Sequence, residues 1–217
     1  MTTTAVPADH LRLRERKKLR TRRALVDAAL ELFTERGFEA TTLEDLCAVV
    51  EVSKRTFFRN FAGKEDVALT PAQDMWAAFL DELERCEPDA GRPVMEMVQD
   101  CLLAAVGRMT AGDWARQVRL GELLAARTPS MRAYGLHLCD RTTREALAIL
   151  RRRLDLGGVD DLRARFVLDL LVAAWRGALE SWASLPGEPA SGDLTACLRA
   201  AFAAIPGCLT LTAAPKA

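Results

Sequence analysis

Apolar residues recur at spacings of three and four along almost the whole chain of 217 residues, a pattern typical of amphipathic α-helices. No segment alternates apolar and polar residues convincingly, so no β-strand is predicted. Glycine and proline interrupt the pattern and set the expected helix ends. The predicted helices cover residues 13–36, 54–61, 64–87, 94–110, 113–127, 129–156, 160–185 and 191–205, with a further short helix through residues 46–49. The sequence therefore predicts an all-α fold.

Residues 41–61 have the order helix, short turn, helix, which is the spacing of a helix–turn–helix motif. The first helix of the motif is expected to begin with a capping box, in which a threonine and an acid three residues later satisfy backbone N–H groups reciprocally. Thr41 with Glu44 and Thr42 with Asp45 both have this spacing. Either pair would start the helix at this point.

The second helix of the motif has two chemically different faces. It follows a tight turn at residues 51–52 and is expected to begin at the cap Ser53. Phe57 and Phe61 lie four positions apart and are expected to point inward, with Phe58 also assigned to the core. Their expected neighbours are Phe33, Phe38, Leu46, Val49 and Val52. The other face collects Lys54, Arg55, Thr56, Arg59 and Asn60, either as a solvated surface or as a surface for nucleic acid.

Charge is unevenly distributed, although 30 basic and 30 acidic residues give a formal net charge of zero. Residues 1–61 carry 12 basic and 9 acidic residues, so the net charge of this part is +3. Eight of the basic residues lie within residues 10–23, against Glu15 alone. Positive charge at a helix N-terminus opposes the helix dipole. This basic arm is therefore expected to meet an anionic partner, the alternative being a helix end that serves only solubility.

The sequence offers little for catalysis or metal binding. Its six cysteines include no CxxC pair and its only histidines are His10 and His137, so a zinc site of the usual spacing is not expected. It contains no phosphate-binding glycine motif and no GxSxG motif. The cysteines are expected to be reduced, buried side chains, with a thiol redox sensor as the alternative. We expect no enzyme activity, no cofactor and no metal.

No stretch approaches the roughly eighteen consecutive apolar residues of a transmembrane helix. The first residues, MTTTAVPADHLRLRERKK, lack the apolar region of a secretory signal. We therefore expect a soluble, cytoplasmic protein with no membrane partner.

The motifs of residues 20–66 together resemble the TetR family of bacterial transcriptional regulators. The resemblance is carried by the segments RTRRALVDAALELFTERG, FEATT, LEDLCAVVEVSKRTFFRNF and KED. Glu51 and Arg55 stand where many family members have glycine. Phe58 stands where a tyrosine hydroxyl commonly contacts a phosphate, and phenylalanine lacks that hydroxyl. The fold is implied in spite of these departures, whereas the phosphate contacts are expected to differ.

The resemblance implies an N-terminal three-helix, helix–turn–helix DNA-binding domain and a C-terminal helical domain for effector binding and dimerisation. The expected boundaries are a disordered arm over residues 1–12, the DNA-binding domain over 13–63, the second domain over 64–206 and a tail over 207–217. The implied function is that of a homodimer, more often a repressor, which binds a palindromic operator in double-stranded DNA and is released by a small molecule. The alternative is a helical protein-interaction module whose helix–turn–helix has lost DNA binding.

The resemblance also implies which residues meet DNA. Arg55 and Lys54 are the expected readers of base edges, because both side chains reach guanine O6 and N7 in the major groove. Lys64, at the start of the next helix, is expected to contact a phosphate. The full set of expected DNA contacts is Thr42, Ser53, Lys54, Arg55, Thr56, Phe58, Arg59, Asn60 and Lys64.

Two further sets of residues are assigned in the C-terminal part. A pocket for an apolar or amphipathic effector is expected among Met75, Phe79, Val98, Leu102, Trp114 and Leu120, with ordinary core packing as the alternative. A dimer interface is expected from Leu168, Leu171, Trp175, Leu179, Trp182, Leu198 and Phe202, with an intrachain core as the alternative. Arg116 and Arg119 are either receptors for an anionic group or solvated.

Overall fold

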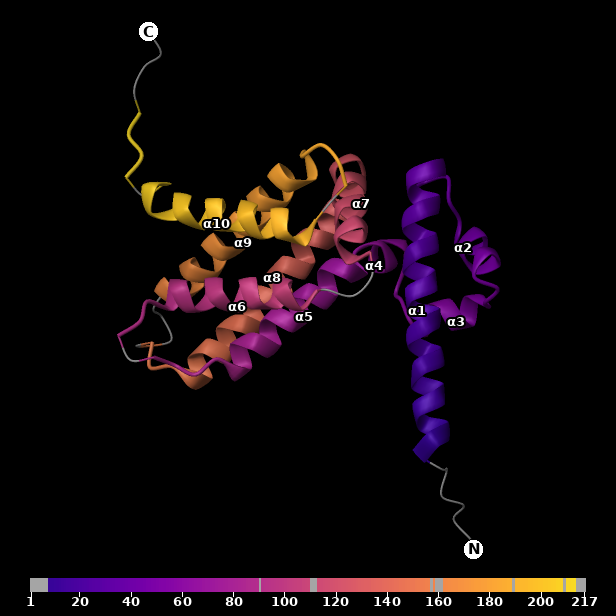
Figure 1. Cartoon of the computed structure of the whole chain (residues 1–217), viewed down its shortest axis with the longest axis horizontal. Helices are drawn as coiled ribbons and strands as arrows, with labels where there is room; N and C mark the ends of the chain where they lie inside the picture. The colour runs from indigo at the N-terminus through magenta and orange to yellow at the C-terminus, as the bar shows by residue number, and fades with distance from the viewer. Residues whose placement is uncertain are drawn as a thin grey trace, which may run out of the picture. The chain divides into compact units, whose positions relative to one another are not determined.

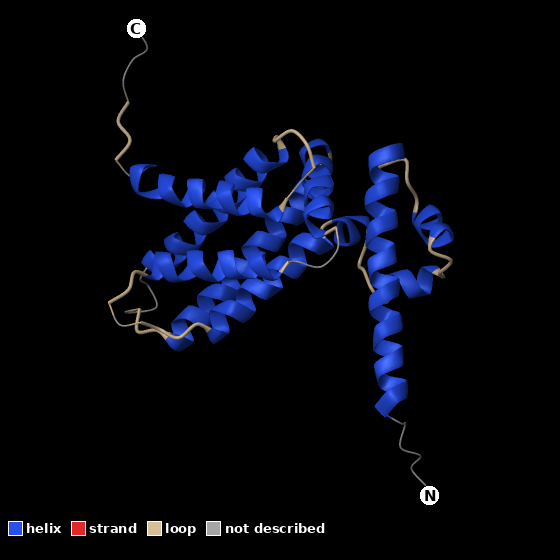
Figure 2. Ribbon diagram, viewed as in Figure 1, coloured by secondary structure: helices blue, strands red, loops and turns tan. Residues whose placement is uncertain are grey.

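The computed structural model describes residues 8–89, 91–109, 113–156, 158, 162–188, 190–208 and 210–213, with side chains from residue 15 onward. Every regular element within these residues is an α-helix, as predicted (Figures 1 and 2). None of the described helices is long and apolar enough to cross a membrane. The chain divides into two units, residues 1–70 and 71–217, and each unit is described by itself.

The N-terminal unit contains α1 (Ala8–Arg36), α2 (Leu43–Val49), α3 (Lys54–Phe58) and α4 (Lys64–Ala68). α1 begins at Ala8 and not at residue 13, so residues 8–12 of the arm predicted to be disordered are helical. No glycine or proline interrupts residues 8–36, so nothing in the chain breaks the helix before that point. Residues 1–7 lie outside the described residues. α4 packs against α1, which explains why the boundary between units follows α4 and not residue 63 as predicted.

Glycine ends α1 as the pattern predicts. Gly37 has a φ of 91°, in the left-handed region that glycine adopts without steric cost. Its N–H donates to the carbonyl of Phe33 at 3.1 Å.

The two adjacent threonines before α2 have different roles: Thr42 caps the helix, and Thr41 is buried. Thr42 and Asp45 form the capping box, with Thr42 N–H donating to Asp45 Oδ2 at 2.8 Å and Asp45 N–H donating to Thr42 Oγ1 at 3.2 Å. Thr41 is buried, and its hydroxyl donates to the carbonyl of Gly37 at 2.9 Å. Of the two capping pairs left open by the sequence, the one containing Thr42 is therefore formed.

The turn between α2 and α3 has an unusual backbone at Glu51. Its φ is 55°, and Glu51 is the one non-glycine residue with a positive φ among the described residues. The turn is closed by Val52 N–H, which donates to the carbonyl of Cys47 at 2.9 Å. Ser53 then caps α3, accepting a hydrogen bond from Thr56 N–H at 3.2 Å. The chain thus adopts, with glutamate, the conformation for which glycine is better suited.

α3 and the helix after it are shorter than predicted. α3 ends at Phe58 and not at residue 61, and Asn60 Nδ2 donates to the carbonyl of Thr56 at 2.7 Å, a side-chain bond that competes with helix continuation. The predicted helix over residues 64–87 is two helices, α4 and α5 (Thr70–Arg85). Pro71 explains the break, because it has no N–H to donate to the carbonyl four residues earlier.

The core of the N-terminal unit is aromatic. Phe33 and Phe57 are 1% and 0% exposed, and the ring centroids of Phe33 and Phe38 lie 4.8 Å apart. Phe61 is also buried, with its ring centroid 5.6 Å from that of Phe57. The inward direction predicted for Phe57 and Phe61 is confirmed. The core assignments of Phe58 and Val49 are wrong, since these side chains are 55% and 60% exposed.

The C-terminal unit is built around α9. Beyond α5 it contains α6 (Val94–Arg108), α7 (Trp114–Arg127), α8 (Pro129–Arg153), α9 (Arg163–Ala183) and α10 (Ser191–Cys208). α9 contacts α6, α7, α8 and α10, so it lies at the centre of this bundle (Figure 1). Asp160 and Asp161, which were predicted to begin this helix, lie outside the described residues. α10 continues past Pro206 to Cys208, so residues 207–208 of the predicted tail are helical.

Replacing Glu51 by glycine should stabilise the N-terminal unit. A left-handed conformation costs an L-residue about 1–2 kcal/mol, while glycine loses about 0.5–1 kcal/mol of conformational entropy on folding. Glu51→Gly is therefore expected to raise the free energy of unfolding by about 0.5–1 kcal/mol, as measured by urea denaturation followed by circular dichroism. The control Glu51→Ala keeps the strain, so an equal gain from alanine would contradict this explanation.

Candidate nucleic-acid interface

α3 presents a continuous arc of exposed side chains. Lys54, Arg55, Phe58 and Arg59 are exposed, whereas Phe57 is fully buried. Successive residues of a helix are rotated by about 100°, so the exposed side chains follow one another around the side opposite Phe57. Thr56 and Asn60 are half-buried at the margins of this arc, and the capping residue Ser53 is exposed. The surface expected to meet DNA is therefore available, with an aromatic ring within it.

Lys54 is already engaged by a neighbouring helix. Its ammonium group forms an ion pair with the carboxylate of Glu44 on α2, and both side chains are more than half exposed. The hydrogen bond from Lys54 holds the pKa of the Glu44 carboxyl below its usual value. Arg55 and Arg59 form no ion pair within the described part of the chain. Arg55 is therefore the better placed of the two residues predicted to read base edges.

The basic arm of α1 meets the end of α3. A pocket of about 450 Å³ lies between them, lined by Glu15, Lys17, Lys18, Thr21, Arg59 and Asn60. Next to it, the guanidinium of Arg22 lies over the ring of Phe61, 5.5 Å from the centroid. The sequence shows both clusters of positive charge but not that Lys17, Lys18 and Arg59 share one concave surface, because a helical pattern does not specify which helix faces which. The side chains of Arg12 and Arg14 lie outside the described residues.

Asn60 and Thr42 form hydrogen bonds with their own chain. Asn60 Nδ2 donates to the carbonyl of Thr56, and its Oδ1 is buried without a hydrogen-bond partner among the described residues. The amide N–H and the hydroxyl of Thr42 both donate to Asp45 Oδ2, at 2.8 and 2.6 Å, and these bonds lower the pKa of the Asp45 carboxyl. The amide nitrogen of Asn60 and the amide and hydroxyl of Thr42 therefore already form hydrogen bonds within the fold.

Lys64 has a structural role that the sequence prediction missed. Its ammonium group donates to the carbonyl oxygens of Phe38 at 2.6 Å and Thr41 at 3.0 Å. It also lies 4.4 Å from the centroid of the Phe38 ring, within the range of a cation–π interaction. These contacts connect the start of α4 to the segment between α1 and α2. These two hydrogen bonds use two of the three N–H donors of Lys64, and the phosphate contact assigned to it stays a prediction.

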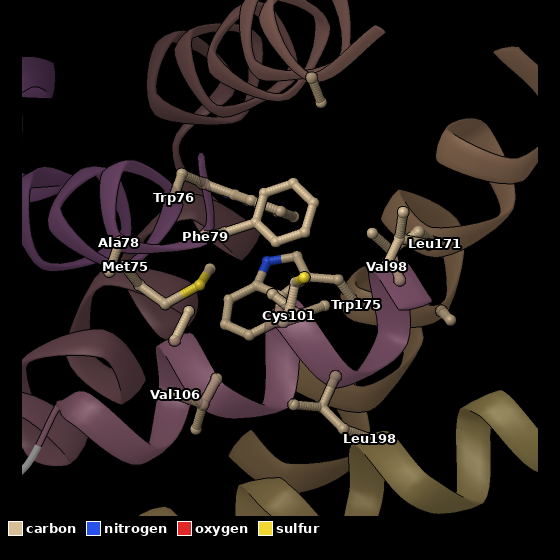
Figure 3. Close-up of a cluster of buried hydrophobic side chains, with 14 of the residues drawn as sticks. Met75, Trp76, Ala78, Phe79, Val98, Cys101, Val106, Leu171, Trp175 and Leu198 are labelled. Atoms are coloured by element: carbon tan, nitrogen blue, oxygen red, sulfur yellow. The ribbon is translucent and has the colours of Figure 1, made fainter. Parts of the chain in front are cut away.

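The residues predicted to form an effector pocket lie mostly in one apolar cluster. Met75, Phe79, Val98, Leu102 and Trp114 are buried together, whereas Leu120 is half-buried and outside the cluster. Figure 3 shows Phe79 and Met75 near Trp76, Cys101 and Trp175. Trp175 packs on Trp76 with ring centroids 5.4 Å apart, so α9 contributes to this cluster. Trp114 anchors the start of α7, because its indole N–H donates to the carbonyl of Pro71 at 3.0 Å.

A polar cluster lies beside α7 that the sequence did not reveal. Glu122 is partly buried, and burial raises the pKa of its carboxyl, as does the neighbouring Glu180. The positive charges of Arg176 and Arg132 lower the same pKa.

Arg119, which was considered as a receptor for an anionic group, instead donates to the carbonyl oxygens of Leu185 at 2.9 Å and Gly187 at 2.6 Å. It therefore holds the segment that follows α9.

The predicted dimer interface is wrong at the level of residues. Every side chain assigned to it is at most 7% exposed in the single chain: Leu168, Leu171, Trp175, Leu179, Trp182, Leu198 and Phe202. These residues form the intrachain core, which was the alternative. Helical periodicity reveals the apolar face of a helix but not whether another helix of the same chain or a second chain covers it. The exposed face of α10 is instead rich in small residues: Gly192, Ala196, Ala200, Ala203, Ala204 and Gly207. On α9, Ala173 and Gly177 are exposed beside the charged residues Arg176 and Glu180.

The cysteines are unpaired thiols, and the described residues include no group of histidine, cysteine and acidic side chains that could hold a metal ion. Burial raises the pKa of Cys101 to about 12 and that of Cys139 to about 11. These two thiols therefore stay protonated at neutral pH. The prediction that the cysteines are buried is confirmed for Cys47 and Cys101, whereas Cys86, Cys139 and Cys197 are half-buried and Cys208 is exposed in the last turn of α10.

Removing the Lys64 ammonium should destabilise the N-terminal unit. Lys64→Met keeps the length of the side chain but leaves two carbonyl oxygens without their charged donor, at an expected cost of about 1–3 kcal/mol in the free energy of unfolding. The matched control is Lys17→Met on the exposed basic arm, which is expected to leave stability unchanged. Urea denaturation measures both variants. If Lys64→Met leaves the free energy of unfolding unchanged but makes the salt dependence of DNA binding shallower, the structural role is contradicted and Lys64 contacts a phosphate.

The comparisons with known proteins agree with this geometry. Residues 25–69 match the family described as bacterial regulatory proteins, tetR family. The HTH-type transcriptional regulator TcmR of Streptomyces glaucescens is 37% identical over 175 residues, which cover 78% of this chain and 76% of TcmR.

Solved structures share the fold at lower identity. A transcriptional regulator of the TerR/AcrR family from Aquifex aeolicus VF5 has a TM-score of 0.51 and 16% identity, over 85% of this chain and 99% of the other. SmeT, the repressor of the Stenotrophomonas maltophilia multidrug efflux pump SmeDEF, has a TM-score of 0.50 and 22% identity, over 84% and 89%. The resemblance predicted from residues 20–66 is confirmed by the similarity to TcmR along most of both chains. The protein belongs to the TetR family and is a helix–turn–helix, DNA-binding transcriptional regulator.

Proposed function

We propose that the protein acts as a homodimeric repressor that binds a palindromic operator through α3 and the basic arm of α1, and that a small-molecule effector releases it. The exposed arc of α3 is the observation that carries this proposal, because Arg55 and Arg59 have no ion-pair partner within the described residues. Base-reading arginine contacts are the commonest specific contacts in the major groove. Once the operator sequence has been selected from a library, its positions in the genome identify the regulated genes.

Arg55 and Arg59 have different tasks in this proposal. Arg55 lies in the first turn of α3, and the N-terminal residues of a recognition helix are those that contact base edges. Arg59 lies at the other end of α3, beside Lys17 and Lys18, where a concave basic surface suits the phosphate backbone. Lys54 joins the DNA surface only by exchanging its contact with Glu44 for one with DNA.

The dimer is proposed to form through the small-residue faces of α9 and α10. Gly177 is exposed on α9, and a Cβ placed on it would meet nothing within 4 Å, so its surface is open to a second helix. Glycine and alanine let helix backbones approach closely, and α9 packs along α10 within the chain. Two copies of this helix pair would form a four-helix interface with twofold symmetry. A twofold dimer presents two copies of α3 to the two halves of a palindrome.

The effector is proposed to be apolar or amphipathic and to bind in the C-terminal unit. The cluster that includes Met75, Phe79 and Trp114 supports this, because methionine and aromatic side chains adapt to apolar ligands. A ligand that binds one conformation of the dimer more tightly shifts the population toward it. Release follows if the favoured conformation changes the distance between the two copies of α3.

The alternative function, a protein-interaction module with a degenerate helix–turn–helix, loses part of its basis. It rested on Glu51, which stands where many family members have glycine, and on Phe58, which lacks the hydroxyl of the usual tyrosine. Glu51 nevertheless adopts the left-handed conformation of the turn, and Ser53 caps α3 in the ordinary way. The departure at Glu51 therefore does not deform the motif.

DNA binding by the full-length protein is expected to be sequence-selective and sensitive to salt. The purified protein is used to enrich duplexes from a randomised library, and fluorescence anisotropy then measures Kd for the enriched and random duplexes at two salt concentrations. Arg55→Ala is expected to weaken binding to the enriched duplex by roughly 5- to 150-fold, the equivalent of about 1–3 kcal/mol for a base-reading arginine. Arg144→Ala, an exposed arginine on α8, is the control that should change little. Failure to enrich any palindrome would contradict the proposal.

A larger side chain at Gly177 should separate the dimer. Glutamine favours the helix more than glycine does, so Gly177→Gln is expected to preserve folding while it obstructs close approach by a second copy. Analytical ultracentrifugation should give a dimer for the unchanged protein and predominantly monomer for the variant at micromolar concentration. Ala133→Gln on the exposed side of α8 is the matched control. A variant that stays dimeric with an unchanged dissociation constant would place the interface elsewhere.

A further inference from the structure

Phe58 is an exposed aromatic side chain on the most basic surface of α3. Its side chain is 55% exposed, although the two phenylalanines nearest to it in sequence, Phe57 and Phe61, are 0% and 3% exposed. The core is thus filled without Phe58. A large apolar side chain that stays more than half exposed calls for an explanation when polar side chains surround it.

The position of the Phe58 ring is defined by its neighbours. The ring meets Phe57 edge-on, with centroids 5.5 Å apart and the ring planes at 90°. Lys54 and Arg55 precede Phe58 by four and three positions, so their side chains lie on the same side of the helix. Phe58 is therefore held from behind by Phe57 and accompanied by cations on the exposed arc.

The charge around Phe58 selects its partner. Flanking cations favour a polyanion, and the proposed function supplies duplex DNA, whose major groove admits a helix. A phenyl ring has no hydrogen-bond donor for a phosphate or for a base edge. The one apolar group that base pairs present in the major groove is the methyl group on C5 of thymine, and phenylalanine is among the side chains that contact it.

We propose that Phe58 is a specificity-determining residue that reads thymine, with its ring packed on the thymine methyl group, next to the base pair that Arg55 contacts. This inference rests on the proposed DNA binding and adds to it the identity of a base and the atom that is read. Arg55 and Phe58 lie three positions apart on one helix face, so they read neighbouring positions of each half-site. Arginine supplies the hydrogen bonds to guanine, and phenylalanine supplies the apolar contact.

The test removes the methyl group and nothing else. Each thymine of the selected duplex is replaced in turn by deoxyuridine, symmetrically in both half-sites, and anisotropy measures Kd for the full-length protein. The unchanged protein is expected to lose about fourfold in affinity per half-site at one thymine position, as expected for the loss of one buried methyl group. Phe58→Ala is expected to bind the thymine and deoxyuridine duplexes equally at that position, because the ring that senses the methyl group is gone.

Two further variants make the outcome specific. Phe58→Tyr keeps the ring and should keep the preference for thymine over deoxyuridine. Leu136→Ala removes another exposed apolar side chain, on α8 in the C-terminal unit, and should leave that preference unchanged. Circular dichroism checks that each variant folds, which is expected because both replaced side chains are exposed.

The outcomes separate this inference from the proposal on which it depends. If the library yields a palindrome but no deoxyuridine substitution weakens binding, thymine reading is overturned while the DNA-binding function stands. If Phe58→Ala raises Kd by the same factor on the thymine and the deoxyuridine duplexes, the preference for thymine is kept without the ring. The ring then contacts the sugar–phosphate backbone, which also overturns thymine reading. If no duplex is enriched, both the function and the inference fall.

Discussion

The burial of Phe57 and Phe61 is the constraint on which the DNA-binding surface depends. α3 spans only Lys54–Phe58, far short of the roughly 12–15 residues at which an isolated helix becomes even marginally stable. Its existence and its orientation must therefore come from contacts with the rest of the unit. Phe57 is held in the core and Ser53 caps the first turn. These two residues fix the rotation of α3, and so they fix the directions of its other side chains. Arg55, Phe58 and Arg59 face outward because Phe57 faces inward.

Some of the residues predicted to bind DNA also form contacts within the N-terminal unit. Lys54 is paired with Glu44, and Lys64 is bonded to the carbonyl oxygens of Phe38 and Thr41. The first contact joins α3 to α2, and the second joins the start of α4 to the segment between α1 and α2. Part of the positive charge visible in the sequence therefore stabilises the fold. The set that remains for the proposed DNA contacts is narrower: Arg55 in α3, Arg59 at its C-terminal cap, and the lysines of α1 beside Arg59.

α9 places most of its large apolar side chains on one side. Trp175 and Trp182 enter the core of their own chain, where they displace the most water. Small residues such as Ala173 and Gly177 remain outside, as does Phe166 near the start of the helix, which is 57% exposed. A close partner helix suits this outer face better than solvent does, whereas the inner face is already satisfied. The apolar cluster proposed to bind the effector and the proposed dimer surface therefore lie on different sides of α9, so a ligand that moves α9 would affect both.

The sequence by itself determined the helical class, the helix–turn–helix over residues 41–61 and the family, because these depend on local spacing, caps and chain breakers such as Gly37. It also placed Phe57 and Phe61 inside, since an apolar pair four positions apart shares a helix face. Only the tertiary structure decided that Phe58 lies outside, that Lys64 donates to two backbone carbonyl oxygens and that most of the large apolar residues of α9 face their own chain. Each of these depends on which helix packs on which face, and periodicity along one segment carries no information about the segment that covers it.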